Sequence, residues 1–203
     1  MQLYQRTIQN AVSISGKGLH SGKKTTVNFT PAPAGSGISF LRKDLGKHVP
    51  ALAKYITETN RGTSLEYDGA EVRTTEHVLA AIASLGIDNV VIELSGAEIP
   101  ILDGSAAPFV SSLEKAGIQE QGVRRRYFKP SKPIHFHLED TDSDFTLEPA
   151  DDFQIHVVVD YDTEVLGVST AEMKDFSKFK EDFSSARTFC FLHELEQLAE
   201  NNL

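Results

Sequence analysis

Glu76 and His77 are the adjacent side chains best suited to chemistry, and they stand where an apolar stretch begins. VRTTEHVLAA at 72–81 predicts a helix from Thr75 to about Leu85. Thr74 is predicted to be its N-cap, which places both reactive side chains in the first turn. The partial positive charge of a helix N-terminus favours a carboxylate at Glu76 and a neutral imidazole at His77.

A neutral imidazole can bind a metal, and a carboxylate beside a metal-bound water is the general base of many hydrolases. The plainer interpretation is a Glu matched to the helix dipole beside a surface His. One His cannot hold a catalytic zinc, which usually has three protein ligands. HFH at 135–137 is favoured as a solvated strand face, and HELEQ at 193–197 lacks the second His of the zinc-protease pattern. These residues alone therefore favour the plainer interpretation.

Two turns that contain glycine supply further candidates. GKGLHSG at 16–22 has neither the dinucleotide fingerprint nor the P-loop spacing, and a strand rather than a helix follows it. It is interpreted as a turn, from which His20 can reach a neighbouring site. In PILDGSAAPF at 100–109, Asp103 precedes a helix capped by Ser105. A capping role for Asp103 is favoured over a chemical one.

SSARTFCF at 184–191 places Arg187 and Thr188 beside Phe189 and Phe191. An Arg and a Thr next to exposed aromatic rings would suit an oxyanion and an acyl-bearing or ring-bearing substrate. Two such phenylalanines are nevertheless more often part of a core. Both interpretations stay open from the residues alone.

The bulk composition is that of an ordinary globular protein. The 203 residues, 40% hydrophobic and 24% charged, suffice for one large domain or two small ones. We expect neither a transmembrane segment nor a secretory signal, because the chain has no long apolar stretch. A single cysteine excludes an internal disulfide and favours the cytoplasm. With a net charge of −9 and basic residues clustered only at 124–126, no nucleic-acid partner is expected.

Hydrophobic patterns predict strands followed by helices, twice along the chain. Strands are expected around 12–14, 27–29 and 38–41, at 86–94 and at 98–102, with a hairpin turn at 66–69 and a second helix ending at Gly117. Two prolines and a charge run at 121–133 indicate a linker. Beyond it, strands are expected at 134–140, 144–149 and 153–161, and helices at 171–183 and 186–200. The prediction is an α+β fold of two similar layers, each of strands and helices, with domains at 1–124 and 125–203 and the second layer incomplete.

Several stretches together resemble the UDP-3-O-acyl-N-acetylglucosamine deacetylase family (LpxC) of lipid A biosynthesis. They are SGKGLHSGKK, NRGTSL, TTEHVLAAIASLGIDNVVIEL, EIPILDGSAAPFV and ARTFCFLHELEQL, in the family's order over nearly the whole chain. T-x-E-H-x-x-A-A followed by P-I-x-D-G-S-A-A-P-F is a specific combination. The sequence is also similar to the branch in which the deacetylase is fused to a 3-hydroxyacyl-carrier-protein dehydratase. The resemblance implies that the two α+β layers pack helix to helix.

The resemblance implies a cytoplasmic, Zn²⁺-dependent hydrolase that removes acetate from UDP-3-O-(3-hydroxyacyl)-N-acetylglucosamine, the committed step of lipid A biosynthesis. It implies that Glu76 is the general base that activates the zinc-bound water and that His77 is a zinc ligand. Thr188 matches the threonine that stabilises the oxyanion together with the metal. The matched positions that contact the substrate or lie near it are Phe189, Phe191, Asp103 and His20.

The resemblance also implies that the chain covers the N-terminal two-thirds of the deacetylase part. The family's other two zinc ligands, in a His-Lys-x-x-Asp segment, and its general-acid His have no match in these 203 residues. We therefore expect the 203 residues alone to bind zinc weakly and to show little or no activity. The alternative is a non-catalytic α+β binding or interaction module that uses the groove between its layers without a metal.

Overall fold

The computed structural model describes residues 2–192, which form two compact units. The first unit comprises residues 2–124 together with 180–192, and the second unit comprises residues 125–179. The chain therefore leaves the first unit at Arg125 and returns to it at Lys180, whereas the sequence predicts a single second domain over 125–203. Residues 193–203 of that predicted domain lie outside the described residues.

A five-stranded sheet, in the order β2-β3-β9-β4-β5, is the base of the first unit. Its strands are β2 (Val12–Lys17), β3 (Lys24–Pro31), β9 (Val90–Leu94), β4 (Ile38–Arg42) and β5 (Lys47–Pro50). β4 and β9 pair in parallel, and the other neighbours are antiparallel. Burial alternates along β3 and β9, so one face of each of these two strands lies in the core. One apolar row crosses the whole sheet in register: Val12, Phe29, Ile92, Phe40 and Val49.

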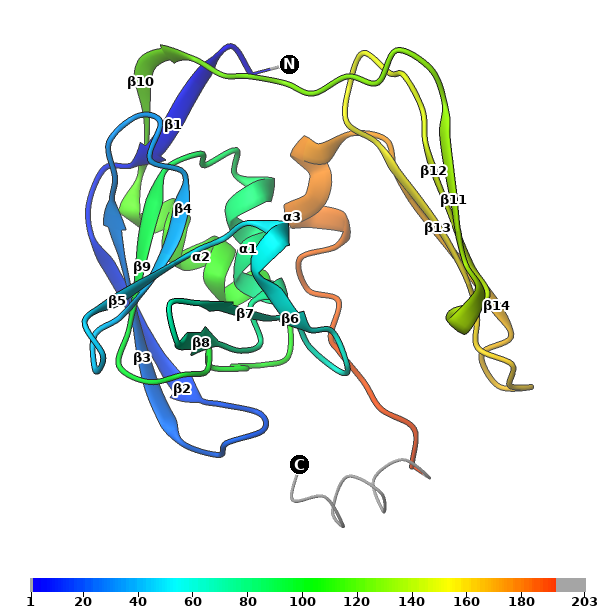
Figure 1. Cartoon of the computed structure of the whole chain (residues 1–203), viewed down its shortest axis with the longest axis horizontal. Coiled ribbons are helices and arrows are strands. Elements are labelled where there is room, and N and C mark those ends of the chain that lie inside the picture. Colours follow the sequence, from blue (N-terminus) through cyan, green and yellow to red (C-terminus); the bar gives the residue numbers. More distant parts are fainter. Residues whose placement is uncertain (1, 193–203) are drawn as a thin grey trace. The chain divides into compact units, whose positions relative to one another are not determined.

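Two helices, α1 (Glu76–Ser84) and α2 (Ala107–Ala116), pack on each other and lie on the same side of this sheet (Figure 1). α1 buries Val78, Ala81 and Ile82, which share one face because they are spaced three and four residues apart. α2 ends at Gly117, whose φ of 75° suits a residue without a Cβ. Both predicted helices of the first half of the chain are confirmed.

Two smaller sheets complete the first unit. A three-stranded sheet consists of β6 (Ile56–Glu58), β7 (Ser64–Tyr67) and β8 (Ala70–Val72), preceded by the 3₁₀ turn η1 (Ala53–Tyr55). The predicted hairpin turn is confirmed between β7 and β8, where Asp68 and Gly69 have φ of 52° and 71°. β1 (Tyr4–Ile8) pairs antiparallel with β10 (Ile118–Arg124), a pairing that the sequence patterns did not indicate.

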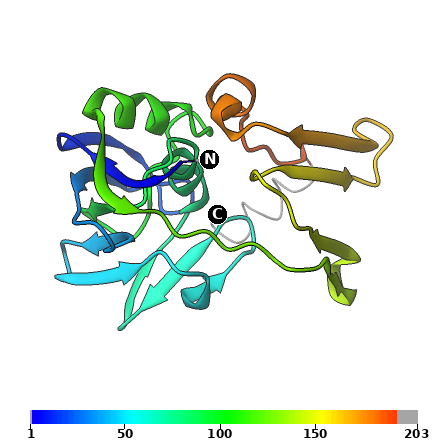
Figure 2. The same cartoon turned by 90° about the horizontal axis from the view of Figure 1, so that it is seen from above.

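The second unit contains two separate two-stranded hairpins (Figure 2). β11 (Ile134–Leu138) pairs with β12 (Ser143–Leu147) across η2 (Glu139–Thr141), and β13 (Ile155–Asp160) pairs with β14 (Val168–Met173). η3 (Phe176–Lys178) follows β14, and the ring of Phe176 meets that of Phe153 edge-on at 5.3 Å. The short helix α3 (Phe179–Asp182) begins at the end of this unit. The three strands predicted after the linker are thus confirmed.

Two predicted elements are wrong, and a third is wrong over most of the part that the structure describes. The expected strand at 98–102 is only an isolated bridge between Arg73 and Glu98. The expected helix at 171–183 begins as the last residues of β14 and is helical only in η3 and α3, because pairing with β13 outweighs the helix propensity of 171–173. Residues 186–191 of the helix expected at 186–200 are irregular, and 193–200 lie outside the described residues.

The protein is nevertheless a mixed α+β fold with several sheets and few helices, as the sequence predicts. No helix in the part of the chain that the structure describes is long and apolar enough to cross a membrane.

Candidate active site

The first turn of α1 is held by the loop that precedes β7. Thr75 is the N-cap residue, and its amide and its hydroxyl both donate to the Thr63 carbonyl, at 3.1 and 2.9 Å. The Thr63 N–H in turn donates to Oε2 of Glu76 at 2.8 Å. Because these hydrogen bonds run in both directions between loop and helix, the Glu76 carboxylate has a defined position at the helix N-terminus.

The predicted N-cap is wrong by one residue. Thr74 has a φ of 58°, a left-handed conformation that is costly for a β-branched residue and turns the chain into the helix. Its buried hydroxyl lies 3.4 Å from Oε1 of Glu98 and does not cap the helix. Glu76 is therefore the first helical residue and His77 the second.

His77 lies beside the carboxylate that precedes it. Its Nε2 is 3.8 Å from Oε1 of Glu76, and the two side chains are 17% and 36% exposed. A catalytic zinc usually needs three protein ligands. Within residues 2–192 the structure groups no three His, Cys, Asp or Glu side chains that could hold a metal ion. The described residues therefore do not fit a zinc site by themselves.

His20 lies near the same carboxylate. Both side chains approach Gly62, where a Cβ atom would lie 3.6 Å from Oε1 of Glu76 and 3.9 Å from Nε2 of His20. The glycine thus leaves open the space that both polar groups face. The structure brings together three of the predicted residues, Glu76, His77 and His20.

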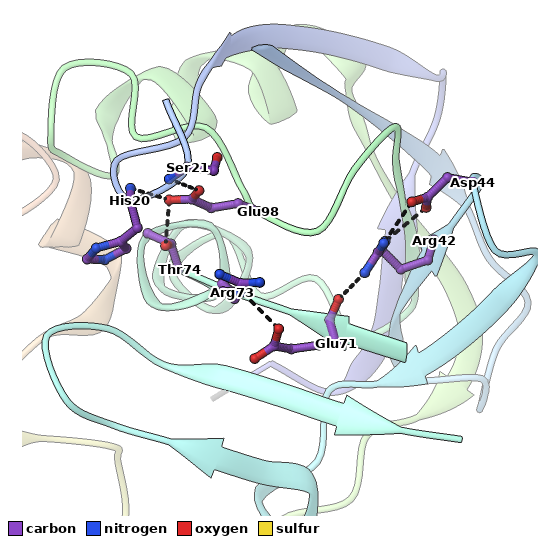
Figure 3. Close-up of polar contacts among 8 residues, drawn as sticks. All are labelled: His20, Ser21, Arg42, Asp44, Glu71, Arg73, Thr74 and Glu98. Atoms are coloured by element: carbon purple, nitrogen blue, oxygen red, sulfur yellow. Dashed lines mark hydrogen bonds and ion pairs between the residues drawn. The ribbon is translucent and has the colours of Figure 1, made fainter. Parts of the chain in front are cut away.

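Glu98 anchors the turn that carries His20, although sequence reasoning gave it no role. The carboxylate accepts the amides of His20 and Ser21, at 2.8 and 2.9 Å, and lies beside the Thr74 hydroxyl (Figure 3). The side chain is only 2% exposed. Burial alone would raise the pKa of Glu98, but hydrogen bonds from Ser21 and from the amide of His20 outweigh it, and the pKa lies below its ordinary value.

The remaining predicted residues gather at the turn that enters α2. Oδ1 of Asp103 accepts the hydroxyl and the amide of Ser105, at 2.8 and 3.1 Å. The hydroxyl hydrogen bond, with smaller help from the nearby charge of Arg187, holds the pKa of Asp103 below its ordinary value. The Thr188 amide donates to the Gly104 carbonyl at 2.9 Å, which places Thr188 next to Asp103.

Phe189 and Phe191 follow Thr188 in an irregular segment. Their rings meet edge-on at 5.7 Å, and Phe189 is 57% exposed. The predicted site residues thus fall into two groups, one held by Thr63 and Glu98 and the other by Ser105 and Gly104.

A pocket of about 290 Å³ borders Glu98, with Lys23, Lys24, Arg42 and Arg73 among its lining residues. Two of these four cations are already paired with carboxylates (Figure 3). Arg42 donates to both carboxylate oxygens of Asp44, at 2.9 and 2.7 Å, and Arg73 donates to Glu71 at 2.8 Å. These ion pairs connect β4 and β8 to the loops that follow them, so Arg42 and Arg73 stabilise the fold in addition to lining the pocket.

The sequence matches one protein family over almost its whole length. Residues 5–203 match the family described as LpxC: UDP-3-O-acyl N-acetylglycosamine deacetylase. The bifunctional enzyme LpxC/FabZ of Chlorobaculum tepidum is 42% identical over 206 residues, which cover 100% of this chain and 44% of that protein. The UDP-3-O-acyl-N-acetylglucosamine deacetylase of Shewanella halifaxensis is 44% identical over 207 residues, which cover 99% of this chain and 67% of that protein.

The chain thus spans 44% of the length of the first relative and 67% of the second. The family match extends over the β-sheet, both helices and every predicted site residue. The chain therefore belongs to the LpxC family of UDP-3-O-acyl N-acetylglycosamine deacetylases.

Proposed function

We propose that this chain supplies part of the active site of an enzyme that deacetylates UDP-3-O-(3-hydroxyacyl)-N-acetylglucosamine in lipid A biosynthesis. Family membership supports the substrate class, and the fixed position of Glu76 supports the chemistry. The observation that carries the proposal is the hydrogen bond from the Thr63 amide, which orients the Glu76 carboxylate beside His77 at a helix N-terminus.

Glu76 is proposed as the general base. Oε2 is occupied by the Thr63 amide, whereas Oε1 faces His77 and the space at Gly62. The side chain is 36% exposed, so water can reach it. A carboxylate held in this way can accept a proton from water as the water oxygen bonds to the acetamido carbon. The C–N bond then breaks, acetate leaves, and the sugar amine takes up a proton.

Thr188 is proposed to stabilise the oxyanion through its hydroxyl group. The residue is exposed, and its amide is anchored to Gly104, so the backbone beneath the hydroxyl is held in place. Donors that are already positioned before charge develops are the ones that lower a barrier. Substrate contacts are proposed for His20, Asp103 and the paired rings of Phe189 and Phe191.

Zn²⁺ remains a proposal that family membership supports. His77 is the proposed ligand from this chain, and one imidazole does not hold a catalytic zinc. Because the described residues do not complete a metal site, we expect these 203 residues alone to retain zinc weakly and to turn over little substrate. A cytoplasmic location is likewise proposed, in keeping with a single cysteine. A fused dehydratase in the same protein is proposed because one relative is the bifunctional enzyme LpxC/FabZ.

The test is Glu76→Gln in the complete gene product that contains these residues. Glutamine keeps the shape and can still accept the Thr63 amide, but it cannot take up a proton. We expect acetate release from UDP-3-O-(3-hydroxyacyl)-N-acetylglucosamine, followed by mass spectrometry, to fall by about 10²-fold or more. Glu114→Gln is a matched control, because Glu114 is a helical carboxylate that is also 36% exposed and is paired with Lys180. An unchanged rate in folded Glu76→Gln would refute the proposal and favour a non-catalytic interaction module.

A further inference from the structure

Glu98 is a buried carboxylate that belongs to no helix or strand. It follows β9 in an irregular segment and is 2% exposed. Its Oε1 accepts the His20 amide at 2.8 Å and its Oε2 accepts the Ser21 amide at 2.9 Å. Burying an ionised carboxylate is costly unless its oxygens are hydrogen-bonded. Both oxygens of Glu98 are satisfied, and both by the same turn.

The segment that carries Glu98 is also fixed to the approach of α1. The Arg73 amide donates to the Ala97 carbonyl at 2.8 Å, and the Ile99 amide donates to the Arg73 carbonyl at 3.1 Å. Oε1 of Glu98 lies 3.4 Å from the hydroxyl of Thr74, two residues before Glu76. One carboxylate therefore touches two stretches of chain that are far apart in sequence, the turn at 18–22 and the residues just before the helix (Figure 3).

The turn is shaped to bring this carboxylate close. Gly18 lies against it, since a Cβ at this position would overlap the Glu98 carboxylate and lie 2.6 Å from Oγ of Ser21. The Gly18 amide donates to the Lys23 carbonyl at 3.0 Å, and its carbonyl accepts the Gly22 amide at 3.2 Å, which closes the turn. The glycine leaves room for the carboxylate, and the carboxylate then fixes the backbone from which the His20 side chain projects.

We propose that Glu98 is a positioning residue that holds His20 in place opposite Glu76. The Nε2 atom of His20 and the Oε1 atom of Glu76 both lie within 4 Å of the Cβ position of Gly62. Glu98 accepts a hydrogen bond from the backbone amide of His20, and it also contacts the hydroxyl of Thr74, two residues before Glu76. It thereby sets the spacing between a base and a substrate-contacting imidazole without touching the substrate. The role of His20 in substrate binding rests on the proposed function, whereas the positioning of His20 by Glu98 does not.

The first experiment reads His20 directly and needs no activity. The wild-type complete gene product and its Glu98→Gln variant are both labelled with ¹⁵N. We compare their amide resonances for His20 and Ser21 and their ring resonances for His20. Glutamine would present an N–H group to one of the two amides, so we expect these resonances to move. In Glu93→Gln they should stay where they are, because Glu93 is a carboxylate of neighbouring β9 that contacts Asn28 and Lys43 instead. Unmoved His20 resonances in folded Glu98→Gln would overturn the proposal.

The second experiment is a kinetic double-mutant cycle with UDP-3-O-(3-hydroxyacyl)-N-acetylglucosamine. Glu98→Gln is expected to raise KM by at least about tenfold, the effect of a displaced hydrogen-bonding group, with a smaller change in kcat. In a His20→Ala background the same substitution should have little further effect, because Glu98 acts through His20. Equal losses in both backgrounds would show a merely structural role and overturn the proposal.

Two further outcomes separate the proposals from each other. If the wild-type protein does not deacetylate the substrate, the proposed function fails, while the resonances still decide whether Glu98 positions His20. If Glu98→Gln does not fold, Glu98→Asp takes its place. Aspartate keeps the charge but is one methylene shorter, so it cannot reach both amides and should move the same resonances.

Discussion

Gly18→Ala tests the close fit between the turn at 18–22 and Glu98. Gly18 is buried, and a methyl group there would overlap the Glu98 carboxylate and lie 2.6 Å from Oγ of Ser21. Overpacking of a buried position costs about 1–3 kcal/mol. The carboxylate would also have to shift away from the amides that it accepts, and a hydrogen bond to a charged group contributes about 1.5–3 kcal/mol. Because the carboxylate can shift in part without losing either bond fully, we expect a loss of roughly 2–4 kcal/mol in the free energy of unfolding.

The assay is thermal and urea unfolding followed by circular dichroism. For a chain of this size, 1 kcal/mol corresponds to about 2–4 °C, so the expected fall in Tm is roughly 5–15 °C. Gly96→Ala is the matched control, because its Cβ would make only an ordinary contact with Oγ1 of Thr25 at 3.6 Å. A Gly18→Ala midpoint equal to that of Gly96→Ala would refute the reasoning about this turn.

Two further predictions concern acid stability and a buried cation. The pKa of Glu98 is lower in the folded protein than its ordinary value of 4.5, so its carboxylate adds stability above that pH, and the gain is lost as the pH falls through the folded pKa. Glu98→Gln should therefore flatten the fall in urea midpoint between about pH 5 and about pH 3, and an unchanged slope would contradict this. Arg42→Met removes a buried guanidinium that donates to both oxygens of exposed Asp44, and we expect it to lower the free energy of unfolding by about 1–3 kcal/mol in urea titrations. Lys47→Met breaks an exposed ion pair and should change the free energy of unfolding by less than about 0.5 kcal/mol. Equal losses in Arg42→Met and Lys47→Met would contradict the argument.

Local patterns were sufficient for the elements that they control. α1 was predictable because Val78, Ala81 and Ile82 repeat at helical spacing, and the hairpin was predictable because Asp68 and Gly69 suit its turn. β1 was not predicted because YQRTI shows no clear alternation of apolar and polar residues and its partner strand lies more than a hundred residues away. The failure at 171–173 has the same origin: Ala, Glu and Met favour a helix locally, but pairing with β13 decides the structure.

The sequence singled out candidate site residues one by one, but it did not indicate how they would be arranged. Glu76 and His77 stood out because a carboxylate and an imidazole are adjacent at a helix start. Nothing local indicated that Gly62 would bring His20 to the same carboxylate, since that requires three distant segments to meet. Glu98 gave no signal either, because an isolated Glu among apolar residues says nothing of donors that lie 78 and 24 residues away.

The pairing of β1 with β10 has a consequence for the order in which the chain is made. Ile8 pairs with Ile118 and Tyr4 with Arg124, so β1 leaves the ribosome more than a hundred residues ahead of its partner. At about 5–20 residues per second, β1 waits roughly 5–20 s before β10 exists. An unpaired strand can bind a neighbouring chain, and charged or polar residues such as Gln5 and Arg6 discourage this. The pairing of β1 with β10 can therefore form only after all strands of the five-stranded sheet have been synthesised, and the composition of β1 suits a strand that must stay unpaired until then.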